Sequence, residues 1–191
     1  RVHNMYHFKF DPAERFYYHH GMNKRVVEEG ASWPHYHSLY EIYFLEEGNC
    51  TYFIDNKVYN VQPGDIVIIP DGIIHHTKYD NIKHSRILIN CNRAYIPDSM
   101  QSDVSSGKYF YRNPFIVDEV RKTLEKIEND TISKYYEGKS SIMKGIKEWI
   151  ADVASNEELS KKFESDTNII IVAGKKDFIN HINRLVFNLK R

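Results

Sequence analysis

The sequence of 191 residues has little cysteine, no excess of either charge and no long apolar run. Its two cysteines, Cys50 and Cys91, are too few for a disulfide scaffold and suit a reducing cytosol. Because 26 Lys and Arg balance 26 Asp and Glu, no overall field attracts nucleic acid or an anionic membrane. The longest aliphatic stretches, Ile66–Ile69 and Ile169–Ala173, are far too short to cross a bilayer.

The first residues also lack the apolar segment of a secretory signal peptide and an initiator methionine. We therefore expect a fragment of a longer cytoplasmic protein. With 41% hydrophobic and 14% aromatic residues, the chain can bury a substantial core, which excludes a disordered tail.

The sequence pattern changes near Pro97. Before it, short runs rich in Val, Ile, Tyr and Phe are separated by turn residues such as Asp55-Asn56 and Pro63-Gly64-Asp65. The runs with the clearest strand pattern are Glu41–Leu45, Thr51–Ile54, Lys57–Val61, Ile66–Ile69 and Arg86–Asn90. Short strands at near-regular spacing predict an antiparallel sandwich or barrel.

After Pro97 the pattern becomes helical. The polar residues 99–107 predict a loop, and Asn113 followed by Pro114 is a favourable helix start. An apolar seam then recurs at helical spacing at Val117, Val120, Leu124 and Ile127. Further helical elements are expected over residues 140–153, 156–163 and 176–189. Residues 168–173 fit either a strand or a buried helix.

A histidine-rich stretch carries the residues best suited to chemistry. Alternate residues of an extended strand share a face, so His35, His37, Glu41 and Tyr43 can all point into one interior. A second stretch, residues 64–76, ends in His75 and His76. If its strand pairs beside the first, His75 completes three imidazoles and one carboxylate around a point. Such a set suits a divalent ion of Zn, Ni, Fe, Mn or Co. The alternative is that these side chains line a pocket without an ion.

Both stretches match the two sequence motifs of the cupins, which are jelly-roll β-barrels. The residues that carry the match are His35, His37, Glu41 and Gly48 in the first motif and Gly64, Pro70, Gly72 and His75 in the second. The second motif departs only at its end, where Tyr79 replaces the usual Asn. Over residues 30–92 the sequence also resembles the sensor domain of AraC-family transcription regulators.

The resemblance implies a mainly β fold with helices. It divides the chain into a cupin barrel over residues 1–97, a linker over 98–112 and a helical segment over 113–191. In that family the barrel takes up a small effector, often a sugar, the helices form a dimer interface, and a separate C-terminal domain binds DNA. This sequence shows no such DNA-binding domain, so DNA binding is expected only of a longer parent protein. The resemblance thus implies a cytoplasmic, homodimeric sensor domain rather than an enzyme.

Candidate effector contacts lie on the His and Glu face or at the expected barrel mouth. They are Trp33, His35, His37, Glu41, Tyr43 and His75. An aromatic ring can stack on a sugar, and a guanidinium can hold hydroxyl or carboxylate oxygens. For Tyr52 and Arg86 the sequence assigns no face, and a packing role is equally consistent.

A stand-alone metal-dependent cupin enzyme, of the dioxygenase or isomerase type, is the alternative function. The complete His and Glu set favours it, because a bound ion can act as a Lewis acid. Against it, roughly 80 residues after the barrel exceed what a minimal cupin enzyme needs. Two smaller choices also stay open: the seam from Val117 to Ile127 fits core packing or a dimer contact, and His19 and His20 fit an ordinary strand or an arm near the pocket.

Overall fold

The computed structural model of the chain describes residues 2–7, 16–24, 33–80, 83–138, 167–173 and 177–190. The strands in these residues are β1 (Val2–His7), β2 (Phe16–Lys24), β3 (Tyr40–Glu47), β4 (Cys50–Ile54), β5 (Lys57–Val61), β6 (Ile66–Ile69), β7 (His75–Tyr79), β8 (His84–Cys91), β9 (Phe110–Tyr111) and β10 (Thr167–Ala173). The helices are α1 (Asp98–Ser105), α2 (Val117–Gly138) and α5 (Asp177–Leu189), with the short 3-10 turns η3 (Arg93–Tyr95) and η4 (Pro114–Ile116).

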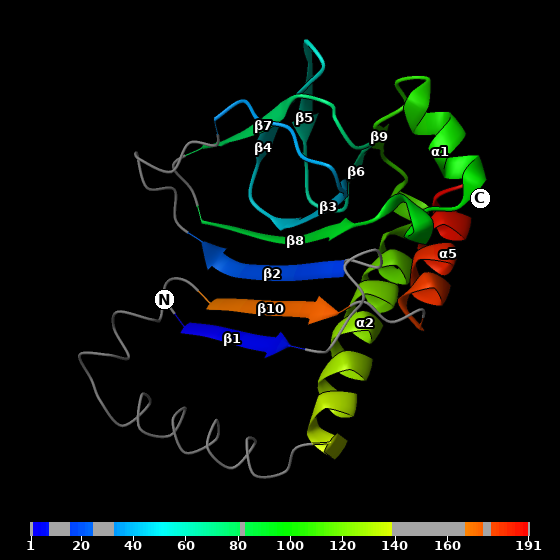
Figure 1. Cartoon of the computed structure of the whole chain (residues 1–191). Helices are drawn as coiled ribbons and strands as arrows, with labels where there is room; N and C mark the ends of the chain where they lie inside the picture. Colours follow the sequence, from blue (N-terminus) through cyan, green and yellow to red (C-terminus); the bar gives the residue numbers. More distant parts are fainter. Residues whose placement is uncertain are drawn as a thin grey trace.

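The strands form two sheets, with the helices gathered at one end (Figure 1). The larger sheet has the order β1-β10-β2-β8-β3-β6-β9, and the smaller has the order β5-β4-β7. This mainly β architecture with a few helices agrees with the predicted fold class. The five runs predicted as strands correspond to β3, β4, β5, β6 and β8.

Residues with left-handed backbone angles make the tight connections. Asp55 and Asn56, with φ of 48° and 63°, form the two-residue turn between β4 and β5. Gly72, with φ of 79°, lies between β6 and β7, and its N–H donates a 2.9 Å hydrogen bond to the carbonyl of His37. The turn residues read from the sequence therefore bring the start of β7 beside the segment before β3.

Helix α2 packs against the larger sheet through its apolar seam. Val120, Leu124 and Ile127 are fully buried within this chain, in one core cluster with the sheet residues. Tyr18 of β2 adds a 3.4 Å hydrogen bond from its hydroxyl to the carbonyl of Leu124. Of the two interpretations of the seam, packing within its own chain is confirmed.

After Pro97, one predicted segment is wrong and one open alternative is decided. The loop predicted over 99–107 is wrong, because helix α1 forms there and buries Met100 and Val104, which lie one helical turn apart. Residues 168–173, which fitted either structure, belong to β10, which pairs parallel with β1 and antiparallel with β2. Its β-branched side chains suit a strand that is paired on both edges. The C-terminal part of the chain therefore adds a strand to the larger sheet besides its helices.

The last predicted helix, over 176–189, is confirmed as α5. Asn113 caps η4, since its side chain accepts a 3.1 Å hydrogen bond from the N–H of Phe115. The helical elements predicted over 140–153 and 156–163 lie outside the described residues. None of the described helices is long and apolar enough to cross a membrane. The predicted domain limits stay a prediction.

Candidate functional site

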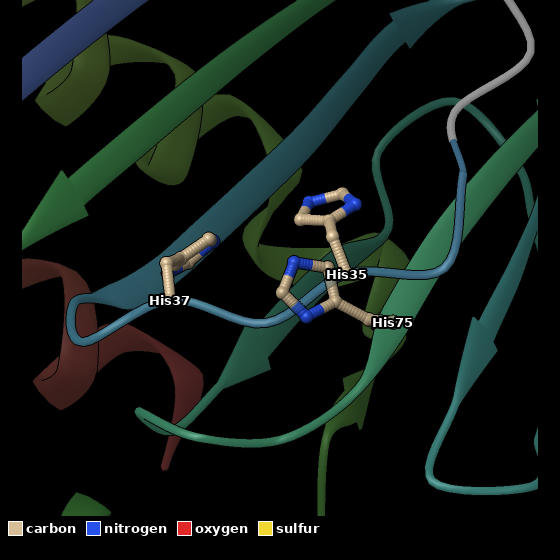
Figure 2. Close-up of side chains that lie close together, drawn as sticks. All are labelled: His35, His37 and His75. Atoms are coloured by element: carbon tan, nitrogen blue, oxygen red, sulfur yellow. The ribbon is translucent and has the colours of Figure 1, made fainter.

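Three imidazole rings gather at one point (Figure 2). His35 and His37 come from the segment before β3, and His75 is the first residue of β7. One ring nitrogen from each residue lies within 4.8 Å of the other two. His75 is buried, His37 is half-buried and His35 is exposed. The cluster therefore has a buried side and a side open to solvent.

The extended strand expected to carry the first two histidines begins only at Tyr40. His35 instead forms an isolated bridge with His75, with backbone hydrogen bonds of 3.1 and 2.9 Å. His37 lies in an irregular segment that the turn at Gly72 holds in place. The even spacing thus identified the right residues, but their positions depend on a bridge and a turn rather than on one strand face.

Each ring is oriented by a backbone carbonyl two residues away. The Nδ1 atoms lie 2.6 Å (His35 to Trp33), 2.9 Å (His37 to Leu39) and 2.7 Å (His75 to Ile73) from the carbonyl oxygens. Because a carbonyl can only accept, each Nδ1 carries a proton, and a neutral ring then has its lone pair on Nε2. Metal-ligating histidines are commonly held in this way by their second nitrogen.

Glu41 of β3 supplies a buried carboxylate, 5% exposed, beside the rings. Its oxygens lie 3.3 Å from the Nε2 atoms of His37 and His75, and Tyr52 donates a hydroxyl hydrogen bond to Oε2. Burial alone would raise the pKa of Glu41, but the two rings and the Tyr52 hydroxyl hold it below its usual range. Burial alone would lower the pKa of His75, yet the Glu41 carboxylate raises it. Glu41 is therefore ionised at neutral pH.

The donor set fits a divalent metal ion. The Nε2 atom of His75 is buried, and apart from the Glu41 oxygen 3.3 Å away it has no polar neighbour that forms a hydrogen bond with it among the described residues. A buried nitrogen in that state is unfavourable, and coordination to an ion would satisfy it. Three imidazole nitrogens with one carboxylate oxygen suit a borderline ion of the kind that the sequence predicted.

A cavity of about 180 Å³ opens beside the cluster. Its walls are formed by His35, Glu41, Tyr43, Tyr52, His75, His76, Thr77, Tyr79, Arg86 and Leu88. The hydroxyls of Tyr43 and Tyr79 are hydrogen-bonded at 2.8 Å, and the ring of Tyr43 meets that of Tyr52 edge-on at 5.1 Å. The walls thus combine aromatic surface with hydroxyl, imidazole and guanidinium groups.

Most of the predicted site residues meet at this cavity. Those that line it are His35, Glu41, Tyr43 and His75, with His37 in the adjoining cluster. Tyr52 and Arg86, whose faces the sequence left open, both line it as well. Trp33 is not among the lining residues: it is 82% exposed, and its carbonyl orients His35. A contact between Trp33 and an effector stays a prediction.

Sequence reasoning missed four lining residues: His76, Thr77, Tyr79 and Leu88. Thr77 and Tyr79 lie at even steps from His75, and Leu88 lies two residues from Arg86, so strand alternation places each pair on one face. The signal in β7 was hidden because its sequence, HHTKY, has a single β-branched residue and was not recognised as a strand.

A second polar cluster lies on the other face of the larger sheet. His20 of β2 bonds through Nδ1 to Glu128 of α2 and through Nε2 to Glu46 of β3. The Tyr18 hydroxyl donates a 2.8 Å hydrogen bond to the same Glu128. Burial alone would lower the pKa of His20, but the two carboxylates raise it to about 9. Of the two interpretations of His20, the ordinary strand is therefore confirmed, and the residue connects β2 to α2.

Two facing sheets around a His and Glu cluster with a cavity define a ligand-binding barrel of the cupin type. The family model described as "AraC-like ligand binding domain" matches residues 26–122, about half of the chain. The chain therefore belongs to this family, as the sequence resemblance predicted. A comparison with curated proteins found no match.

The solved structures that match this chain share little sequence with it. The AraC-like transcriptional activator CuxR is 12% identical, with a TM-score of 0.41 over 49% of this chain and 34% of its own. KdgF from Halomonas sp. is 16% identical, with a TM-score of 0.36 over 46% of this chain and 74% of its own. The conserved SPY1581 protein of Streptococcus pyogenes is 18% identical, with a TM-score of 0.35 over 41% of this chain and 65% of its own. The chain thus spans about two thirds of SPY1581 and one third of CuxR.

Proposed function

We propose that this chain is the effector-binding sensor domain of a longer, cytoplasmic transcription regulator. The cavity carries the proposal, because its aromatic, hydroxyl and charged groups suit a small polar ligand. At about 180 Å³ it is smaller than the roughly 300–1,000 Å³ of sites for larger ligands. A sugar or a small hydroxy acid therefore fits it best. Membership of the AraC-like ligand binding domain family supports the same function.

His35, His37, Glu41 and His75 would hold a divalent ion at the edge of this cavity. Such an ion would supply an electrophile for oxygen atoms of the ligand. The remaining work falls to groups of the chain itself. The Tyr52 hydroxyl keeps the buried carboxylate oriented, and three backbone carbonyls keep the rings oriented. In this proposal Trp33, beside the exposed ring of the cluster, stacks on the bound effector.

Strand β3 connects the cavity with α2. Glu41 and Tyr43 occupy its cavity face, whereas Glu46 occupies the other face and bonds to His20, which bonds to Glu128 of α2. Strand β3 can then take two placements in the barrel, each coupled to a placement of α2. A ligand that binds more tightly when β3 is in one of them shifts α2 as well. In a homodimeric parent protein, such a shift would change the spacing of two DNA-binding domains that lie outside this chain.

The test begins with a thermal-shift screen of this chain against small sugars and hydroxy acids. A ligand that raises the melting temperature should lose its effect in His75→Ala and keep it in Tyr36→Ala, where the side chain is 70% exposed. The same ligand should then change the DNA affinity of the parent protein. A cavity-bound ligand that leaves DNA affinity unchanged would contradict the sensor function.

A metal-dependent enzyme is the second candidate, favoured by the three rings whose Nε2 atoms are left for coordination. Here a ligand of the cavity would be converted rather than only bound. Incubating the metal-loaded chain with each ligand from the screen, and following products by mass spectrometry, separates the two functions. Turnover that disappears in His75→Ala identifies an enzyme, whereas stable binding without product favours the sensor.

A further inference from the structure

Arg86 places a guanidinium in the cavity wall. It lies on β8 opposite Gly21 of β2, which has no side chain to occupy the same face. Arg86 and Leu88 both line the cavity, while Ile87 and Ile89 turn to the opposite face and are buried in the core. The charged side chain is therefore directed inward by the same alternation that builds the barrel.

The positive charge of Arg86 has no carboxylate partner among the described residues. Its Nη1 atom is buried and makes no hydrogen bond to any described group. Glu41, the one carboxylate in the cavity wall, is occupied by His37, His75 and Tyr52. Glu41 attracts Arg86 through space but forms no direct ion pair with it, so the guanidinium has no anion in contact among the described residues of the cavity.

The other polar groups near Arg86 are neutral. Tyr43 and Tyr79 are hydrogen-bonded to each other at 2.8 Å, and a tyrosine hydroxyl is uncharged at neutral pH. The guanidinium itself stays protonated at any pH at which the protein is folded. Arg86 is half-buried, and a charged group whose Nη1 atom is buried without a partner in the described part of the chain is unfavourable until an anion meets it.

We infer that the ligand of this cavity is a small acid and that Arg86 binds its carboxylate in a bidentate manner. The inference rests on the proposed function, because it names the chemical class of the proposed effector. A planar carboxylate matches the two parallel N–H groups of a guanidinium. The hydroxyls of Tyr43 and Tyr79 remain for the hydroxyl groups of the acid. A guanidinium also binds inorganic phosphate in this way, so the test includes phosphate as a separate probe.

The test compares matched acidic and neutral probes by calorimetric titration of the full chain. The probes are glucuronate against glucose, lactate against lactamide, and inorganic phosphate alone. We expect each acid to bind about tenfold or more tightly than its neutral partner. Arg86→Met should remove this preference, and Lys78→Met, which removes an exposed positive charge from neighbouring β7, should keep it.

A second measurement does not depend on any probe. Because Arg86→Met removes a half-buried charge whose Nη1 atom has no partner among the residues described, the ligand-free variant should melt at a higher temperature than the wild-type chain. An arginine that served the structure would give the opposite shift. Arg86→Lys should keep the charge and lose part of the preference for acids, since it lacks the bidentate geometry.

The possible outcomes separate the inference from the proposed function. Equal binding of acidic and neutral probes, or a lower melting temperature in Arg86→Met with acid binding unchanged, overturns the inference and leaves a sensor of neutral ligands. Binding of phosphate in preference to both acids overturns the carboxylate assignment. An acid that binds through Arg86 but never alters the DNA affinity of the parent protein supports the inference and overturns the sensor function.

Discussion

At the scale of single residues, Tyr52 donates to the buried carboxylate of Glu41 from a position that is itself 1% exposed. Tyr52→Phe leaves that charged acceptor without its hydroxyl donor. We expect the free energy of unfolding to fall by about 1–3 kcal/mol, measured by urea denaturation. Tyr36→Phe, at a site that is 70% exposed, is the matched control and should not change it. Equal stabilities for the two variants would show that the Tyr52 bond does not support the fold.

The imidazole cluster makes a separate prediction about metal binding. His75→Ala removes one of three clustered nitrogens and should weaken binding of Zn²⁺ or Mn²⁺ by about a hundredfold or more. His76→Ala is the control. The ring of His76 stacks on that of Phe53, with 4.3 Å between the ring centroids, and does not belong to the cluster. Calorimetric titration with each ion measures the difference. A wild-type chain that binds neither ion, or two variants that bind equally, would contradict a metal site here.

The sequence was sufficient to predict which His and Glu residues lie close together, but not their surroundings; that they bind an ion stays a prediction. His35, His37, Glu41 and His75 could be identified because residue type and spacing are enough to match a motif. The role of Arg86 could not be predicted, since it depends on which strand face is turned inward and on which carboxylates already have partners. Both are tertiary facts that spacing along one strand does not contain.

At the scale of elements, the bonds of His20 to Glu46 and Glu128 join β2, β3 and α2. The pKa of His20 is raised from 6.5 to about 9, so its stabilising charge is fully present below pH 6.5 and is lost as the pH rises through 9. We expect the wild-type chain to lose stability over this range, by an amount on the order of 3 kcal/mol.

The control for this prediction is His20→Gln, which can still form hydrogen bonds but does not titrate. Glu46, Glu128 and the hydroxyl of Tyr18 are the groups that face the ring, and all three are unchanged in the variant. Urea denaturation of both proteins between pH 6 and 9.5 measures the difference. If the two stability curves run parallel, the imidazolium does not contribute to the fold.

Alanine substitution at two glycines distinguishes the cost of backbone strain from the cost of a steric clash. Gly64 precedes β6 with φ of 93°, and a Cβ there would lie 2.9 Å from a methyl group of Val117 in α2. Gly72 has φ of 79°, and a Cβ there would meet nothing within 4 Å. Gly72→Ala should therefore cost about 1–2 kcal/mol from the backbone alone, and Gly64→Ala roughly 1–3 kcal/mol more.

Thermal and urea denaturation measure both glycine variants. In the Gly64→Ala background, Val117→Ala should recover part of the loss, because it removes the two methyl groups that the new Cβ meets. A Gly64→Ala variant that is no less stable than Gly72→Ala would show that the turn and the helix can separate without cost.

Strands and helices were predicted correctly where apolar residues alternate or run continuously, and were missed where few apolar side chains are buried. The runs that became β3 to β6 and β8 carry continuous or alternating apolar residues, so their period was visible. Helix α1 was hidden because only Met100 and Val104 bury apolar side chains among eight mostly polar residues. Residues 169–173 were ambiguous because a short apolar run has no period, and only pairing with β1 and β2 decides its structure.

At the scale of the whole molecule, the proposed path from the cavity to α2 predicts a pattern of hydrogen exchange. An acid bound in the cavity should slow exchange in β3 and β8, and also in α2 around Glu128, because His20 and Glu46 connect them. In His20→Gln the protection of β3 and β8 should remain while that of α2 decreases. Mass spectrometry of exchanged peptides measures both. Protection of α2 that is equal in the two proteins would exclude this route.

The position of β10 also bears on how the chain is made. Strand β1 pairs in parallel with β10, and β10 lies between β1 and β2, so β1 gains its partner, and β2 its second partner besides β8, only after residue 173 has been synthesised. Until then β2 offers an open edge to any other extended chain. Contacts between segments so distant in sequence also form slowly. During translation there is thus a period in which the open edge of β2 must be protected from aggregation. That period ends when β10 pairs with β2.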